Sequence, residues 1–184
     1  MSTPADELTK SPVLYSVHDH PGTIKGHYPF WDSYHRPYLV EGVRLLPPEH
    51  FDYKPKPEML TARQHILHIA ETEAWWVHHM VDGEPFRDFT LRHADPAQGW
   101  TDNYEARDHN QLLFVLEEFH RPTQRWFGAP TKELSKVIHY RRKNGEEMQH
   151  SLHWILDHVL EHELHHRAQL FLYLRMIGIT PPSV

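Results

Sequence analysis

The sequence predicts an all-α fold, a four-helix bundle with a small β-hairpin before the last helix. Four segments carry apolar residues at the three- and four-residue spacing of an amphipathic helix, and glycine or proline follows each of them. One short stretch before the last helical segment has strand-forming residues and a turn dipeptide instead. The chain has 184 residues, of which 39% are hydrophobic, so we expect one core and a single bundle domain over residues 31–184.

Prolines mark the N-terminal part of the chain. Nine of the fifteen prolines lie within the first 57 residues, and proline is poorly tolerated inside helices. Residues 1–30 are therefore expected to form an irregular arm. The first helix is expected over residues 32–46, with Leu39 and Val43 on its apolar side and Pro47 at its end.

The second and third helices are indicated by their ends. Thr61 and Gln64 have the spacing of a capping box, and Gly83 stands where a C-cap belongs, so we expect a helix over residues 61–82. A third helix is expected over residues 101–127, because apolar residues recur along it and Gly128 follows.

The end of the chain predicts a hairpin and a long helix. Val137, Ile138 and Tyr140 favour a strand, and the Asn144-Gly145 dipeptide is typical of a tight turn, which indicates a hairpin over residues 136–148. From residue 151 to residue 177 there is neither proline nor glycine, and Gly178 follows. This segment is the expected fourth helix.

The composition excludes several classes of protein and site. The chain has 19 histidines and no cysteine, so disulfides, thiolate metal sites and cysteine nucleophiles are excluded. The net charge of −6 with neutral histidines argues against a nucleic-acid binder. Residues 1–10 are polar, and no apolar run is long enough to cross a membrane, so we expect no membrane association and a cytoplasmic location.

The last helix carries the strongest chemical signal. His162 and His166 are four residues apart and therefore share one helix face, which suits two ligands to one ion. The string from His162 to His166 also fits H-E-x-x-H, in which Glu163 would be the general base. No histidine, aspartate, glutamate or cysteine follows His166, so a third ligand must come from upstream.

The second helix offers two candidates for that third ligand, His65 and His68. His65 lies nearer the apolar stripe, but either side chain could line a cleft between helices, so the pattern leaves both open. Glu73 and Glu163 lie within the apolar stripes of their helices. Because a carboxylate on a core face is costly unless it is paired, these two residues predict a polar pocket.

The segments LTARQHILHIAETE (60–73), LDHVLEHELHHRAQL (156–170) and YLRMIG resemble the DinB/YfiT-like metalloenzyme family. The resemblance implies a four-helix bundle in which one histidine of the second helix and an H-x-x-x-H pair of the fourth bind a divalent metal. At the matching positions these are His68, His162 and His166. Ala168 stands where the family usually has glycine, a change of one small residue for another.

The resemblance also implies a function. Some family members carry out transfer or isomerisation reactions that depend on low-molecular-weight thiols, others are described as metal-dependent hydrolases, and homodimers are common. We therefore expect a metal-dependent enzyme for a small molecule, with a thiol as co-substrate; hydrolysis by metal-bound water and non-enzymatic metal binding in a stress response are the alternatives. Imidazole ligands suit zinc or nickel, and iron or cobalt are also compatible.

Overall fold

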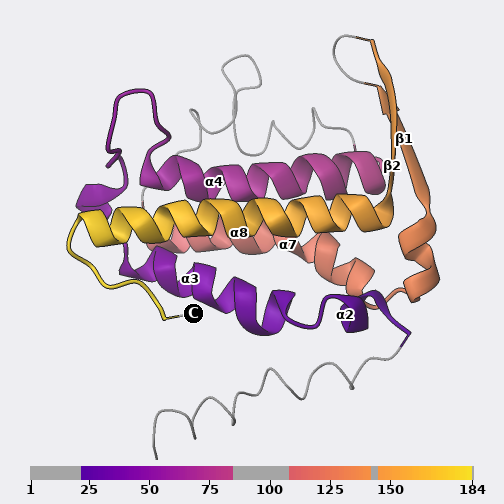
Figure 1. Ribbon diagram of the computed structural model, residues 1–184, viewed down its shortest axis with the longest axis horizontal. Helices are drawn as coiled ribbons and strands as arrows, with labels where there is room; N and C mark the ends of the chain where they lie inside the picture. Colours follow the sequence, from indigo (N-terminus) through magenta and orange to yellow (C-terminus); the bar gives the residue numbers. More distant parts are fainter. Residues whose placement is uncertain (1–21, 85–107, 142–144, 184) are drawn as a thin grey trace, which may run out of the picture.

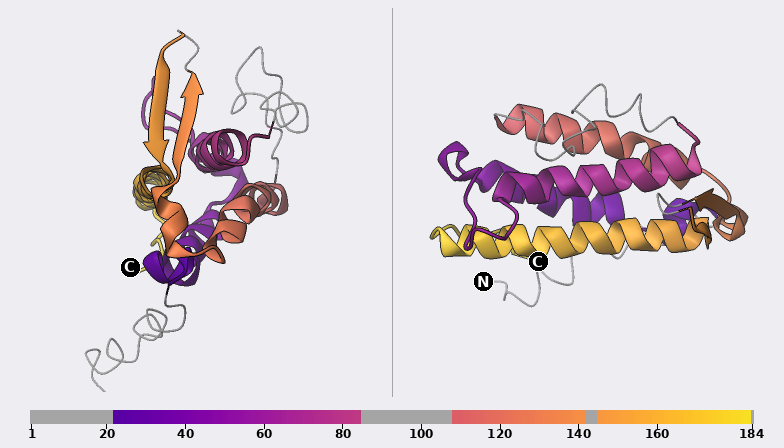
Figure 2. Two further views of the ribbon diagram at one scale, coloured as in Figure 1. Left: turned by 90° about the vertical axis from the view of Figure 1, so that its right-hand side faces the viewer. Right: turned by 90° about the horizontal axis from the view of Figure 1, so that it is seen from above.

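Four helices form the bundle in the computed structural model, which describes residues 22–84, 108–141 and 145–183. They are α3 (Arg36–Leu45), α4 (Ala62–Glu73), α7 (His109–Phe127) and α8 (Leu152–Met176). Seen from one end, the helices lie side by side, and a β-hairpin projects beyond them (Figure 2). The predicted fold class is confirmed.

The helix predicted over residues 61–82 corresponds to α4 together with the π-helix that follows it, and the helix predicted over residues 151–177 corresponds to α8. The backbone N–H of Gln64 donates to Thr61 Oγ1 (3.1 Å), and the backbone N–H of Thr61 donates to Gln64 Oε1 (2.9 Å), so the capping box is present. Beyond Glu73 the helix continues as a π-helix over Ala74–Val81. The hydroxyl of Ser151 caps α8 by accepting the backbone N–H of Trp154.

The segment before α3 is held against the bundle. It contains a short helix, α2 (Ile24–His27), and a π-helical turn over Trp31–His35 that leads into α3. The side chains of Ile24 and Trp31 are fully buried, and the backbone N–H of Ile24 donates to the carbonyl of Ala129. Residues 1–21 of the predicted arm lie outside the described residues.

The predicted start of the third helix is wrong. Helix α7 begins at His109, because Asp108 has an extended backbone and its carboxylate accepts the backbone N–H of Gln111 (2.8 Å). Residues 101–107 lie outside the described part of the chain. Two short 3-10 helices, Pro48–His50 and Thr131–Ser135, complete the helical elements of the described residues.

The predicted hairpin is confirmed as β1 (Val137–Arg141) paired antiparallel with β2 (Glu147–Ser151). Residues 142–146 separate Arg141 from Glu147, which form the last pair of the register. Residues 142–144 lie outside the described residues, and Gly145 has a positive φ of 85°. Strand β2 leads directly into α8, which places the hairpin at the α8 N-terminus (Figure 1).

The core has two parts. One lies between α3, α4, α7 and α8, and the other lies toward the hairpin around Trp31, Phe127 and Ile155. In the first part α3 approaches α8 so closely that a Cβ on Gly42 would clash with the ring of Phe171. Within the described ranges, no helix is both long enough and apolar enough to span a membrane.

Candidate metal centre

Three histidines converge where α4 and α8 lie side by side (Figure 1). His68 comes from α4, and His162 and His166 come from successive turns of α8. One ring nitrogen from each lies within 4.8 Å of the other two. The ring centroid of His68 is 4.8 Å from that of His162 and 4.9 Å from that of His166. The structure thus brings together the three histidines implied by the resemblance.

Hydrogen bonds orient the three rings. His68 donates from Nδ1 to Glu71 Oε2 (2.9 Å), and His166 Nδ1 lies 2.8 Å from His65 Nδ1. These two bonds use the Nδ1 atoms of His68 and His166, so Nε2 is the second possible metal-binding nitrogen of each ring. His162 has a hydrogen bond between Nε2 and the Thr72 hydroxyl (3.2 Å), whereas its Nδ1 is buried without a partner. Each ring therefore has one nitrogen that the bonds to Glu71, His65 and Thr72 do not occupy and that can bind a metal ion.

Burial keeps the rings of His162 and His166 uncharged. Burial and, to a smaller extent, the neighbouring His166 and His68 together lower the pKa of His162 to about 3. Burial also lowers the pKa of His166 to about 3, with His68 and His65 contributing. Both rings are neutral at pH 7, so their lone pairs are available. Three neutral imidazoles fit a divalent transition metal.

His65 is not part of the cluster but supports it. If His166 donates from Nδ1, then His65 accepts at Nδ1 and can donate from Nε2 toward the Tyr173 hydroxyl (3.4 Å). Tyr173 in turn donates to the carbonyl of Leu60 (3.0 Å). This order of donors and acceptors, from His166 through His65 and Tyr173 to Leu60, is consistent with metal binding at His166 Nε2. Of the two candidates that the pattern leaves open, His68 lies in the histidine cluster, and His65 contacts His166.

Glu163 lies in a buried ionic network. Its Oε2 accepts hydrogen bonds from Arg36 Nη1 (2.6 Å) and from the Trp31 indole (3.2 Å). Arg36 Nη1 is also 3.5 Å from Glu73 Oε2, which joins the two carboxylates that the sequence places on core faces. Glu163 thus contacts Arg36 and Trp31, while its role as a general base remains a prediction.

His120 completes this network. It donates from Nδ1 to Glu73 Oε1 and from Nε2 to Asp32 Oδ1, each at 2.6 Å. Burial alone would lower the pKa of His120, but the carboxylates of Glu73 and Asp32 outweigh that effect and raise it to about 9. Sequence periodicity did not identify Arg36 or His120, because their partners lie on other elements of the fold.

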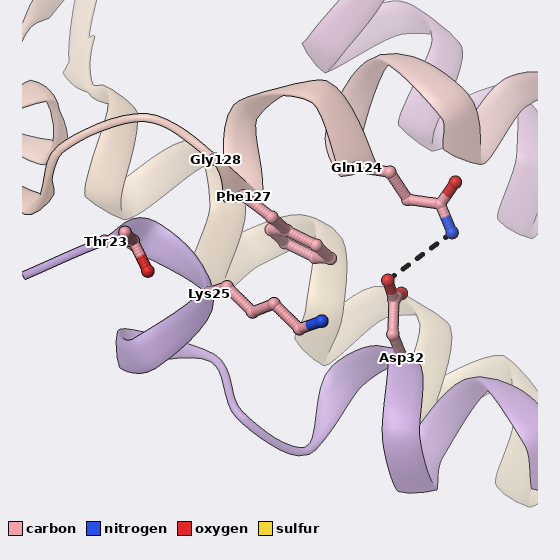
Figure 3. A pocket seen from close by; sticks show the side chains of 6 residues that line it. All are labelled: Thr23, Lys25, Asp32, Gln124, Phe127 and Gly128. Atoms are coloured by element: carbon pink, nitrogen blue, oxygen red, sulfur yellow. Dashed lines mark hydrogen bonds between the residues drawn. The ribbon is translucent and has the colours of Figure 1, made fainter. Parts of the chain in front are cut away.

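A pocket of about 340 Å³ lies on the α2 side of the bundle (Figure 3). Lys25, Asp32 and Phe127 line it, and Gln124 donates to Asp32 Oδ2 (3.4 Å). None of its lining residues comes from α4 or α8. This pocket is therefore separate from the histidine cluster.

Comparisons with known proteins agree with the fold. A family model described as "DinB family" matches residues 30–184. A DinB-like protein from Bacillus subtilis is 22% identical with a TM-score of 0.57, over 81% of this chain and 90% of that chain. A DinB-like protein from Bacillus cereus ATCC 10987 is 18% identical with a TM-score of 0.55, over 90% of this chain and 99% of that one. No curated protein matches the sequence.

Proposed function

The chain belongs to the DinB family, and from this premise we propose that His68, His162 and His166 bind one divalent metal ion that serves catalysis on a small molecule. The observation that carries the proposal is the convergence of three imidazole nitrogens from α4 and α8 within 4.8 Å. In metalloproteins, three protein ligands with an open position are typical of catalytic sites, whereas structural sites are closed by four.

The donor set defines what the site can do. The cluster itself contains no carboxylate or thiolate, so three neutral ligands leave the positive charge of the ion uncompensated. When bound, such an ion lowers the pKa of a coordinated thiol or water and polarises a substrate oxygen. The residues around it fix ring orientation: Glu71 holds His68, Thr72 holds His162 and His65 holds His166.

We assign the reaction to transfer or isomerisation that depends on a small thiol. An anionic thiolate would compensate the charge of a site with only neutral ligands. The chain has no cysteine, so this sulfur must come from a substrate or co-substrate.

Metal stoichiometry tests the first part of the proposal. Untagged protein dialysed against zinc or nickel and then against buffer should retain one ion per chain by elemental analysis. His162→Ala should lose the ion, whereas His165→Ala, a change at an adjacent exposed histidine, should retain it. Several weakly held ions per chain, unaffected by His162→Ala, would indicate metal buffering and contradict the proposal.

A substrate panel tests the second part. The metal-loaded protein is assayed with small thiols and electrophilic acceptors, and separately with esters and amides in the absence of thiol. We expect turnover that requires both the thiol and the metal. Hydrolysis that proceeds equally well without thiol would refute the assigned reaction while leaving the metal site intact.

A further inference from the structure

An aromatic pocket of about 350 Å³ lies at the hairpin end of the bundle. Its walls come from four elements of the fold: the π-helix after α4 (Trp75 and Trp76), strand β1 (Tyr140), strand β2 (Met148 and His150) and α8 (Trp154 and His158). No lysine, arginine, aspartate or glutamate is among its described lining residues. The volume is within the range of small-molecule sites, which are mostly apolar.

Stacked rings give this pocket a fixed wall. The rings of His150 and Trp154 stack with centroids 3.7 Å apart and planes at 14°, and those of Trp154 and His158 stack at 5.0 Å and 7°. Trp76 meets the rings of Trp154 and His158 edge-on, both at 5.4 Å. The rings hold one another in place before any ligand arrives.

The same stack leads to the proposed metal site. Residues 154, 158 and 162 occupy successive turns of α8, and the ring centroids of His158 and His162 are 6.2 Å apart. Each step of four residues advances about 6 Å along a helix. The pocket thus begins about 6 to 12 Å along the helix from the His162 ligand.

Core packing alone does not account for the pocket. Trp154 remains 41% exposed, whereas the core residue Trp31 is fully buried. In the described part of the chain, neither Trp76 nor Trp154 donates a hydrogen bond from its indole N–H, while Trp31 and Trp126 both do. Two indole donors and exposed aromatic surface therefore remain available beside an uncharged cavity.

We propose that this pocket binds a flat, uncharged aromatic group of the substrate while a donor atom of the same molecule reaches the metal. The second half of the proposal rests on the metal site proposed above. An uncharged ring fits because the described lining supplies aromatic surface without a charged partner. The substrate class is thus an aromatic compound whose reacting group lies about 6 to 12 Å from the ring.

Calorimetric titration with two probes tests this proposal on the zinc-loaded protein. 4-Phenylbutanehydroxamic acid joins a phenyl ring to a metal-binding group, and butanehydroxamic acid lacks the ring. We expect the phenyl probe to bind about tenfold more tightly, and Trp154→Ala to remove this advantage. Phe114→Ala, which truncates another exposed aromatic residue, should preserve it. Trp154→Leu retains an apolar side chain without the flat ring and serves if the alanine variant does not fold.

A third probe separates the pocket from the metal site. 4-Phenylbutanol has no strong metal-binding group, so saturation-transfer NMR should detect its ring protons with wild type and with His162→Ala, but not with Trp154→Ala. If neither hydroxamate binds while phenylbutanol does, the metal proposal is refuted and the pocket stands. Equal affinity for both hydroxamates, or an unchanged phenyl advantage in Trp154→Ala, would overturn the pocket proposal.

Discussion

The buried His120 should make the protein less stable at alkaline pH. In the folded protein its ring is charged and donates to Glu73 and Asp32, with a pKa of about 9. In the unfolded chain a histidine has a pKa near 6.5. The folded state therefore holds a proton that the unfolded state releases between these two values, and the stabilisation is complete below pH 6.5 and lost as the pH rises through about 9.

The magnitude follows from this difference in pKa. A shift of one unit corresponds to about 1.4 kcal/mol, so raising the pH from 7 to 9.5 should lower the free energy of unfolding by roughly 2 to 3 kcal/mol. Urea denaturation at several pH values between these limits measures the effect directly. The midpoint should fall steadily while the m-value stays constant.

Two variants test whether His120 is the group that causes the loss of stability at alkaline pH. His120→Gln is uncharged at every pH, so it should be less stable than wild type at pH 7 but lose most of the alkaline slope. His139→Gln changes an exposed histidine on β1 and should keep the wild-type slope. A wild-type midpoint that does not change between pH 7 and 9.5, or an unchanged slope in His120→Gln, would show that His120 is not a buried cation.

Three further predictions concern the metal centre and the helix packing. His65→Ala should weaken metal binding about 10- to 100-fold in a chelator competition assay, because His166 loses its orienting partner while all three ligands remain; unchanged affinity would exclude this role. The metal-free protein should become less stable to urea as the pH falls below 6.5. In the folded protein His162 and His166 have pKa values of about 3, so between pH 6.5 and 3 only the unfolded chain takes up protons at these two residues. A urea midpoint that does not change between pH 7 and pH 5 would contradict those values. Gly42→Ala should cost about 1–3 kcal/mol in thermal or urea unfolding, because its Cβ would meet the ring of Phe171, and an unaltered midpoint would mean that this ring moves aside freely.

Local signals explain why most of the fold could be predicted. The capping box at Thr61, the cap at Ser151 and the positive-φ glycines after α4 and α8 depend on neighbouring residues, so the sequence displays them directly. The predicted start of the third helix is wrong because apolar periodicity does not mark where a helix begins. The capping side chain of Asp108 marks the start of α7.

Some residues of the candidate site could also be predicted from local sequence, whereas others depend on how the helices pack. The four-residue spacing of His162 and His166 predicts a pair of ligands on one helix face. The position of Glu73 within an apolar stripe predicts a buried polar partner for its carboxylate. The choice between His65 and His68 depends on how α4 packs against α8, because both residues contact His166 from different sides. The partner of Glu73, His120, lies 47 residues away on α7, and no local pattern connects them.

The placement of the three histidines on two helices has a consequence for folding. His68 and His162 are separated by most of the bundle's sequence but face each other across α4 and α8. An ion held by both would act as a cross-link that closes a long loop, and such a link limits the freedom of the unfolded chain most when the loop is long. The ion would then link α8 to α4, and the stability of the fold would rise with the concentration of the metal.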